Sequence, residues 1–289
     1  RGRPGGGAPG ANIFGGFGGL TGVLAPQLTK ADVGSALRAR RTWATTGARA
    51  VALLRSGDAW MGDEIDTEDD ELNVDYALYG TSGWDEIAIY DSTGRLWQRN
   101  LHNETGLSDE LVRIRWGGAR HRDRYRWATW SGEVRVTGTE LLDVTLWAAA
   151  HPEQHFDAAG EAVRWRTTTY GSDVGIVVRL ADLAAARFRI QASVHEDGLH
   201  VEREFPGAEL IRAGHIETAV GGLNLRLRAE RVAEFSALPT TVTGDLVLGL
   251  PPGTSATYVR ATQSDGHQVW TSPLFVTRSG GQTRCPEPA

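Results

Sequence analysis

The chain has 289 residues, a formal net charge of −6 and an apolar content of 40%, which are values of an ordinary globular protein able to bury a core. An acidic balance without a basic stripe argues against a nucleic-acid partner, and no apolar run approaches the roughly 20 residues of a membrane helix. Cys285 is the only cysteine, so no intrachain disulfide can form, and we expect a soluble protein of the cytoplasm or periplasm.

Residues 1–22 are rich in glycine and proline and hold no period. They carry no apolar leader, and the only methionine of the chain is Met61. Because the chain starts at Arg1, we expect a part of a longer protein, with a processed precursor as the alternative. The side chains able to anchor this segment on a core are Ile13, Phe14, Phe17 and Leu20.

A helix is predicted from about Thr29 to Arg41. Thr29 is a suitable N-cap, and Asp32 occupies the capping-box position three residues later. Apolar side chains recur at helical spacing at Val33, Ala36 and Leu37. The arginines at the end of this segment favour the negative end of the helix dipole.

After the helix, apolar and polar residues alternate in short runs separated by Gly, Asp and Ser. This pattern predicts an antiparallel β-sandwich rather than βαβ units. Strands are expected at 48–54, 59–61, 75–79, 86–90, 96–100, 112–116, 124–130, 133–137, 144–148, 163–168, 175–180, 187–192, 200–204, 224–228, 244–249, 258–263 and 269–276. The acidic run 63–71 is expected as a solvated loop and 130–132 as a tight turn. Arginine supplies all positive charges except Lys30, so cross-strand Arg–Asp and Arg–Glu pairs are a further expectation.

Ten tryptophans are spread along the predicted β region. They could form a sugar-stacking platform on the sandwich or fill its core, where each ring buries a large area. Most of them occupy alternating strand positions, which favours the core.

No catalytic constellation can be assembled from the residues alone. His151 and His155 are four apart, but Pro152 and the absence of an HExxH pattern favour a surface loop. The glycine cluster 15–19 lacks the ending of a P-loop and favours a tight turn. We therefore assign no catalytic residue, no metal ligand and no cofactor to this chain.

Several segments together resemble one family. They are RGRPG at the start, FGGFGGLTGVLAPQLTK at 14–30, ADVGSALRARRTWATTGAR at 31–49 with Met61-Gly62 after it, VRIRWGGAR at 112–120, WSGEVRVTG at 130–138 and YVRATQSDGHQVWTSPLF at 258–275. In order and spacing they resemble the carboxy-terminal portion of PHP (polymerase and histidinol phosphatase) superfamily metallohydrolases, in a branch of unknown function related to the CehA/McbA-type enzymes. The resemblance covers the chain from residue 1 to about 276.

The resemblance implies an upstream α/β barrel that binds divalent metals, Mn, Fe or Zn, through ligands that precede Arg1. It also implies an active-site rim at Arg1, Arg3, Thr45, Thr46 and Gly47. The arginines would bind an anionic substrate group, with a structural salt bridge as the alternative role. For the two threonines the alternative, which we favour slightly, is capping of the backbone at the turn.

The predicted organisation is therefore the end of a barrel at 1–41, a β-sandwich domain at 42–278 and a disordered tail at 279–289. The parent would be a bacterial hydrolase that cleaves a phosphoester, amide or carbamate by metal-activated water, and this chain alone would be inactive. Its partners would be the barrel domain and a small-molecule substrate, without nucleic acid or membrane. The alternatives are a stand-alone tryptophan-rich module that binds carbohydrate or protein, and a non-catalytic subunit of a split hydrolase.

Overall fold

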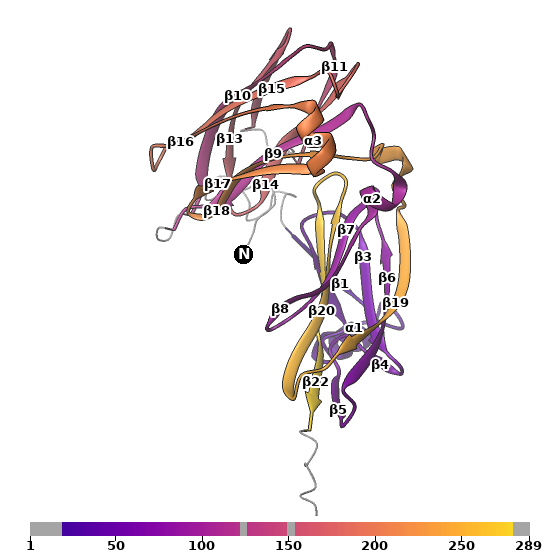
Figure 1. Ribbon diagram of the computed structural model, residues 1–289. Coiled ribbons are helices and arrows are strands. Elements are labelled where there is room, and N and C mark those ends of the chain that lie inside the picture. The colour runs from indigo at the N-terminus through magenta and orange to yellow at the C-terminus, as the bar shows by residue number, and fades with distance from the viewer. Residues whose placement is uncertain (1–18, 122–125, 149–153, 280–289) are drawn as a thin grey trace, which may run out of the picture. The chain divides into compact units, whose positions relative to one another are not determined.

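The computed structural model describes residues 19–121, 126–148 and 154–279 (Figure 1). These residues form several antiparallel sheets with few helices, which confirms the mainly β, sandwich-like fold class. The helices of the described residues are α1 (Lys30–Arg38), α2 (Leu101–Thr105), α3 (Gly207–Ala213) and the 3-10 turn η1 (Phe235–Ala237). None of them combines the length and the apolar character that crossing a membrane requires.

The chain divides into two compact units, and we describe each by itself. The inserted unit is built mainly from His102–Leu238 with Ser264–His267, and the host unit from Leu20–Leu101, Pro239–Gln263 and residues 268–279. In sequence, the first unit therefore interrupts the second. The region 42–278, expected as one domain, contains parts of both.

The inserted unit is a sandwich of two five-stranded antiparallel sheets, with orders β12-β13-β10-β15-β16 and β11-β14-β9-β18-β17. Alternate residues of both sheets form one apolar core, as a period of two requires. Its strands are β9 (Leu111–Ala119), β10 (Ala128–Thr137), β11 (Leu141–Trp147), β12 (His155–Ala159), β13 (Ala162–Thr169), β14 (Asp173–Leu180), β15 (Arg187–Val194), β16 (Leu199–Pro206), β17 (His215–Gly221) and β18 (Leu223–Arg231).

Tryptophan joins these two sheets. The rings of Trp116 on β9 and Trp165 on β13 stack with their centroids 4.1 Å apart. The Trp116 Nε1 donates a 2.7 Å hydrogen bond to the hydroxyl of Thr167, so its polar atom is satisfied inside the core. Within the first sheet, the Nε1 of Trp130 likewise donates a 3.1 Å hydrogen bond to the hydroxyl of Thr169. These pairs combine a large buried area with fixed ring orientation.

The host unit contains an eight-stranded sheet and a four-stranded sheet. The larger runs β1-β2-β21-β20-β22-β5, with β7 beside β20 and β8 beside β7, and the smaller runs β19-β6-β3-β4. The strands are β1 (Leu20–Val23), β2 (Thr42–Thr45), β3 (Val51–Ser56), β4 (Ala59–Trp60), β5 (Glu64–Thr67), β6 (Glu71–Tyr79), β7 (Trp84–Asp91), β8 (Gly94–Asn100), β19 (Thr241–Gly249), β20 (Gly253–Gln263), β21 (Gln268–Thr271) and β22 (Leu274–Arg278). Tyr76 of the smaller sheet packs against Trp97 of the larger one, with ring centroids 5.8 Å apart.

Three local predictions were wrong. The acidic run expected as a loop contains β5, which pairs in parallel with β22. Its acidic side chains therefore lie on the edge strand of the larger host sheet. The turn expected at 130–132 is the interior of β10, where Gly132 leaves room for the ring of Trp165. The helix expected to reach Arg41 ends at Arg38, because Arg40 takes a left-handed conformation with φ 57°.

The tryptophans support the core interpretation. Among the described residues five of them are buried, and none of the others is fully exposed. The buried ones are Trp84, Trp116, Trp130, Trp147 and Trp165.

The predicted cap of α1 is confirmed, since the hydroxyl of Thr29 accepts a 3.1 Å hydrogen bond from the Asp32 amide. We expect Thr29→Ala to destabilise this helix by about 1 kcal/mol, because one amide of the first turn loses its acceptor. Amide hydrogen exchange of the first turn should speed up accordingly. Thr29→Ser keeps the acceptor and should exchange like the wild type, whereas equal rates in all three proteins would contradict the capping role.

Candidate functional site

The predicted rim positions lie at the end of β2, except Arg1 and Arg3, which fall outside the described residues. The buried Thr45 donates its hydroxyl to the Ala48 carbonyl at 2.7 Å and accepts the Gly47 amide at 3.1 Å. Gly47 has φ 123°, a conformation that favours glycine. The Thr45 hydroxyl therefore holds the turn.

Thr46 is bound to the hairpin that follows β20. Its amide donates to the Gln268 carbonyl at 3.0 Å, and its hydroxyl accepts the Gln268 amide at 2.8 Å. Thr46 thus extends the pairing of β2 with β21 by one step. The hydroxyl of Thr45 therefore bonds within its own turn, whereas that of Thr46 bonds to the first residue of β21.

Two arginines that follow α1 form the centre of a polar cluster, which we call the arginine clamp. The Arg41 guanidinium donates to the carbonyls of Trp60 and Met61 at 3.1 and 2.9 Å, and to the Asp63 carboxylate at 2.8 Å. Arg40 donates to the carbonyl of Gly62 at 2.8 Å. Burial opposes ionisation of Asp63, but its hydrogen bond from Arg41 holds the pKa of this carboxyl below its ordinary value.

The clamp also reaches the carboxy-terminal hairpin. The Gly62 amide donates to the Pro273 carbonyl at 2.7 Å, and the Ser272 amide donates to the Thr42 carbonyl at 2.9 Å. The Arg40 guanidinium lies 4.9 Å from the ring centroid of Phe275. Segments far apart in sequence therefore meet at these two arginines.

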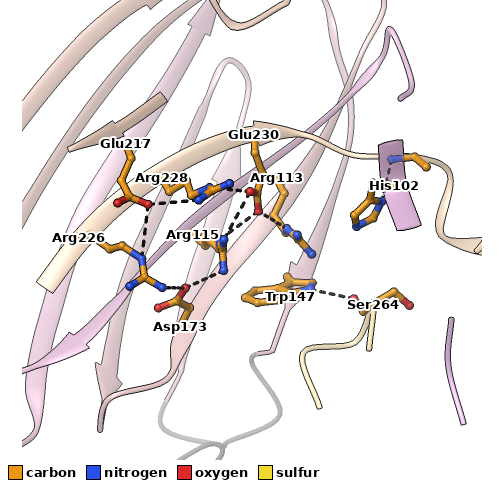
Figure 2. Close-up of polar contacts among 11 residues, drawn as sticks. His102, Arg113, Arg115, Trp147, Asp173, Glu217, Arg226, Arg228, Glu230 and Ser264 are labelled. Carbon is orange, nitrogen blue, oxygen red and sulfur yellow. Dashed lines mark hydrogen bonds and ion pairs between the residues drawn. The ribbon is translucent and has the colours of Figure 1, made fainter. Parts of the chain in front are cut away.

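In the inserted unit, the outward face of the second sheet carries a buried ionic network centred on Glu230 of β18 (Figure 2). Its carboxylate contacts the guanidinium groups of Arg113 at 2.8 Å, Arg115 at 3.0 Å and Arg228 at 2.7 Å. The Glu230 side chain is 9% exposed and that of Arg113 is 6% exposed. Burial alone would raise the pKa of Glu230, but the three cations hold it well below its usual range.

A second carboxylate extends this network, because Asp173 on β14 accepts from Arg115 at 2.9 Å and from Arg226 at 2.8 Å. Gly117 lies beside it, and a Cβ there would come within 2.2 Å of the Asp173 carboxylate. Glycine is therefore required for this close approach. Cross-strand arginine–carboxylate pairs were expected from the arginine-rich composition, and these pairs confirm that expectation.

Trp147 forms the apolar side of the network. The Arg113 guanidinium lies 4.7 Å from its ring centroid, and its Nε1 donates to the Ser264 carbonyl at 2.8 Å (Figure 2). Nearby, the buried His102 accepts the Ala233 amide on Nδ1 at 3.0 Å. The network is structural in character, because both of its carboxylates form ion pairs with arginines.

Two open grooves lie on outward sheet faces. One, of about 770 Å³, crosses β13, β10, β15 and β16, and includes Ser131 and Ser193, whose hydroxyls lie 2.8 Å from the imidazoles of His195 and His200. The other, of about 480 Å³, crosses the smaller sheet of the host unit and is flanked by Trp60 and Tyr79. Sequence reasoning missed both grooves, because each joins strands that are distant in the chain.

Within the described residues, no group of three or more His, Cys, Asp and Glu side chains is placed to hold a metal ion. His155 lies on β12, while His151 falls outside the described residues, as does Cys285.

Comparisons with known proteins do not assign a family. No family model matches the chain, and no curated protein matches it. A solved structure described as a DUF4466 family protein from Parabacteroides merdae is similar over 77% of this chain and 96% of that chain, at 7% identity. Its TM-score of 0.15 is too low to carry an argument.

Proposed function

We propose that the chain is the carboxy-terminal, β-rich part of a bacterial metal-dependent hydrolase like the PHP-type enzymes that the sequence resembles. In the parent enzyme the β units would shape and cover the active site, and the barrel would hold Mn, Fe or Zn and the small-molecule substrate. The bond attacked would be a phosphoester, amide or carbamate. This chain alone would be inactive.

The arginine clamp is the observation that carries this proposal. The resemblance rests in large part on 31–49, on Met61-Gly62 and on the hairpin 258–275. The clamp brings these segments together through hydrogen bonds from Arg40, Arg41 and Gly62. Segments with a common origin in one domain are expected to form one such cluster, whereas chance similarities spread along a chain have no reason to meet.

Exposed apolar side chains near α1 give further support. Leu28 is 98% exposed, Leu37 50% and Leu20 43%. An apolar surface of this kind suits an interface with another domain. In the proposed enzyme the barrel would pack here.

The chemistry of the parent would be hydrolysis by metal-activated water, because a bound metal lowers the pKa of its water and stabilises charge on the attacked oxygen. The metal ligands would belong to the barrel. The contribution of this chain would be positional, through the turn at Thr45, Thr46 and Gly47 on the rim.

The test is the complete reading frame of the parent gene. We expect an Asp-x-His or Asp-His sequence directly before Arg1 and an HxH motif near the start of the protein. The purified product should hydrolyse p-nitrophenyl phosphate, p-nitroanilides or aryl carbamates only with Mn, Fe or Zn, while residues 1–289 alone should not. A reading frame without these ligands, or a product inactive on all three classes, would overturn the proposal and favour the binding-module interpretation.

A substitution at Leu28 tests whether the barrel would pack against this surface. Leu28→Asp should leave the thermal midpoint of residues 1–289 unchanged, since this side chain is already exposed there. In the parent the same substitution should lower the midpoint, because it would place a charge in an apolar interface. An equal response in both proteins would remove this surface from the proposal.

A further inference from the structure

The groove on the small sheet of the host unit, which we call the host-sheet groove, has a volume of about 480 Å³. That volume lies within the range of about 300–1,000 Å³ found for small-molecule sites. Its lining includes the side chains of Arg55, Trp60, Asp75, Tyr79, Thr243 and Asp245.

Strand register places four of these residues in one row. Arg55 on β3 lies opposite Trp60 on β4 and opposite Asp75 on β6, and Asp75 lies opposite Asp245 on β19. Residues directly opposite one another point to the same face of an antiparallel sheet. The row therefore presents an aromatic ring, a cation and two carboxylates across the four strands. Tyr79 lies four residues further along β6 on the same face.

The row contains an electrostatic cost. Like charges directly opposite one another on an antiparallel pair are destabilising, and this is the relation of Asp75 to Asp245. Arg55 compensates Asp75 alone, through a 2.9 Å ion pair. Among the described residues no hydrogen bond or ion pair holds the Asp245 carboxylate. A ligand that donates hydrogen bonds to both carboxylates would remove this cost.

We propose that the host-sheet groove binds a neutral oligosaccharide. Tyr79 is 46% exposed and Trp60 is half-buried, so both can offer ring surface to the C–H faces of sugar rings. Asp75 and Asp245 accept hydrogen bonds from hydroxyl groups, and Arg55 and Thr243 donate them. Two carboxylates against one guanidinium leave the groove with a net negative charge, which disfavours uronic acids and sulfated sugars. The inference does not depend on the proposed hydrolase role.

The test measures binding to the purified chain by isothermal titration calorimetry. The probes are the hexaoses of the cellulose, xylan, mannan and starch series, with a hexagalacturonate as the anionic comparison. We expect at least one neutral hexaose to bind and the anionic one not to bind. If every neutral probe fails to bind at millimolar concentration, or if the hexagalacturonate binds tightest, the proposal is overturned.

Two variants connect binding to the groove. Tyr79→Ala and Asp245→Asn should each weaken the affinity about tenfold or more, since hydrogen bonds to charged groups and aromatic contacts have that magnitude. Asp245→Asn should also keep or raise the thermal midpoint, because it removes the repulsion with Asp75. Asp58→Asn, in the exposed turn between β3 and β4, is the matched control and should bind as the wild type does. Unchanged affinity in both groove variants would also overturn the proposal.

Discussion

Replacing Glu230 by glutamine is expected to lower the free energy of unfolding by about 3–5 kcal/mol, the usual cost of breaking a buried ion pair. The glutamine retains the size of the side chain but not its charge. Three guanidinium groups, those of Arg113, Arg115 and Arg228, would then lie together at the same face without their shared carboxylate. Denaturant unfolding monitored by tryptophan fluorescence measures the loss.

A matched control and the pH dependence make this prediction specific. Glu217→Gln removes a carboxylate that is 40% exposed and pairs with Arg226 and Arg228, so it should cost under about 1 kcal/mol. The pKa of Glu230 is depressed in the folded state, so its contribution is complete above the unfolded value of about 4.3 and is lost as pH falls below it. The difference in stability between the wild type and Glu230→Gln should therefore shrink between about pH 5 and pH 3. A difference that does not change with pH would contradict the assignment.

Gly62→Ala is expected to destabilise the host unit by about 3 kcal/mol or more. Gly62 has φ 98°, and a Cβ there would lie 2.3 Å from the Ala39 carbonyl oxygen and 2.7 Å from that of Arg40. Relief of this clash requires the backbone to move away from the arginine clamp, which would break the bonds of Gly62 with Arg40 and Pro273. Hydrogen exchange of the Gly62 and Arg41 amides, together with the unfolding midpoint, reports the loss.

Gly57→Ala separates conformational strain from the clash. Gly57 has φ 55°, but apart from Gly57 and its two neighbours no described residue has an atom within 4 Å of a Cβ built there. Its cost should be only the strain of a left-handed residue, about 1–2 kcal/mol. Equal losses at Gly57 and Gly62 would show that contact with the clamp has no part in the effect.

Local patterns in the sequence predicted many of the strands and the start of α1, but not β1, β2, β12 and β17. Alternation from 187 to 194 gave a strand with one buried face, and Thr29 with Asp32 gave the start of a helix. The errors occur where contacts with residues distant in the sequence determine the local conformation. Glu64–Thr67 is polar enough for a loop and becomes a strand only because β22 lies beside it. Glycine at 132 indicates a turn when the sequence is taken alone. In the structure Gly132 lies inside β10, where the absence of a side chain leaves room for the ring of Trp165.

The candidate sites were less predictable for the same reason. The alternation of Arg113 with Arg115 is visible in the sequence, yet its partner Glu230 lies on a strand more than a hundred residues away. The row of the host-sheet groove likewise joins Asp75 to Asp245 by a pairing that neither segment encodes alone. The resemblance to a family singled out the segments that form the arginine clamp. The hydrogen bonds that Arg41 donates could be identified only from the three-dimensional structure.

The insertion of one unit into the sequence of the other affects how the chain must fold during its synthesis on the ribosome. Both sheets of the inserted unit are complete once Arg231 has emerged. The strands of the host unit that precede Leu101 wait for β19 to β22, and at about 5–20 residues per second that delay is on the order of ten seconds. During this time β6 and β7 present unpaired edges, which are the sites where strands of separate chains associate. The need for chaperones is therefore greatest for the host unit, whose first strands are made before the inserted unit and whose last strands are made after it.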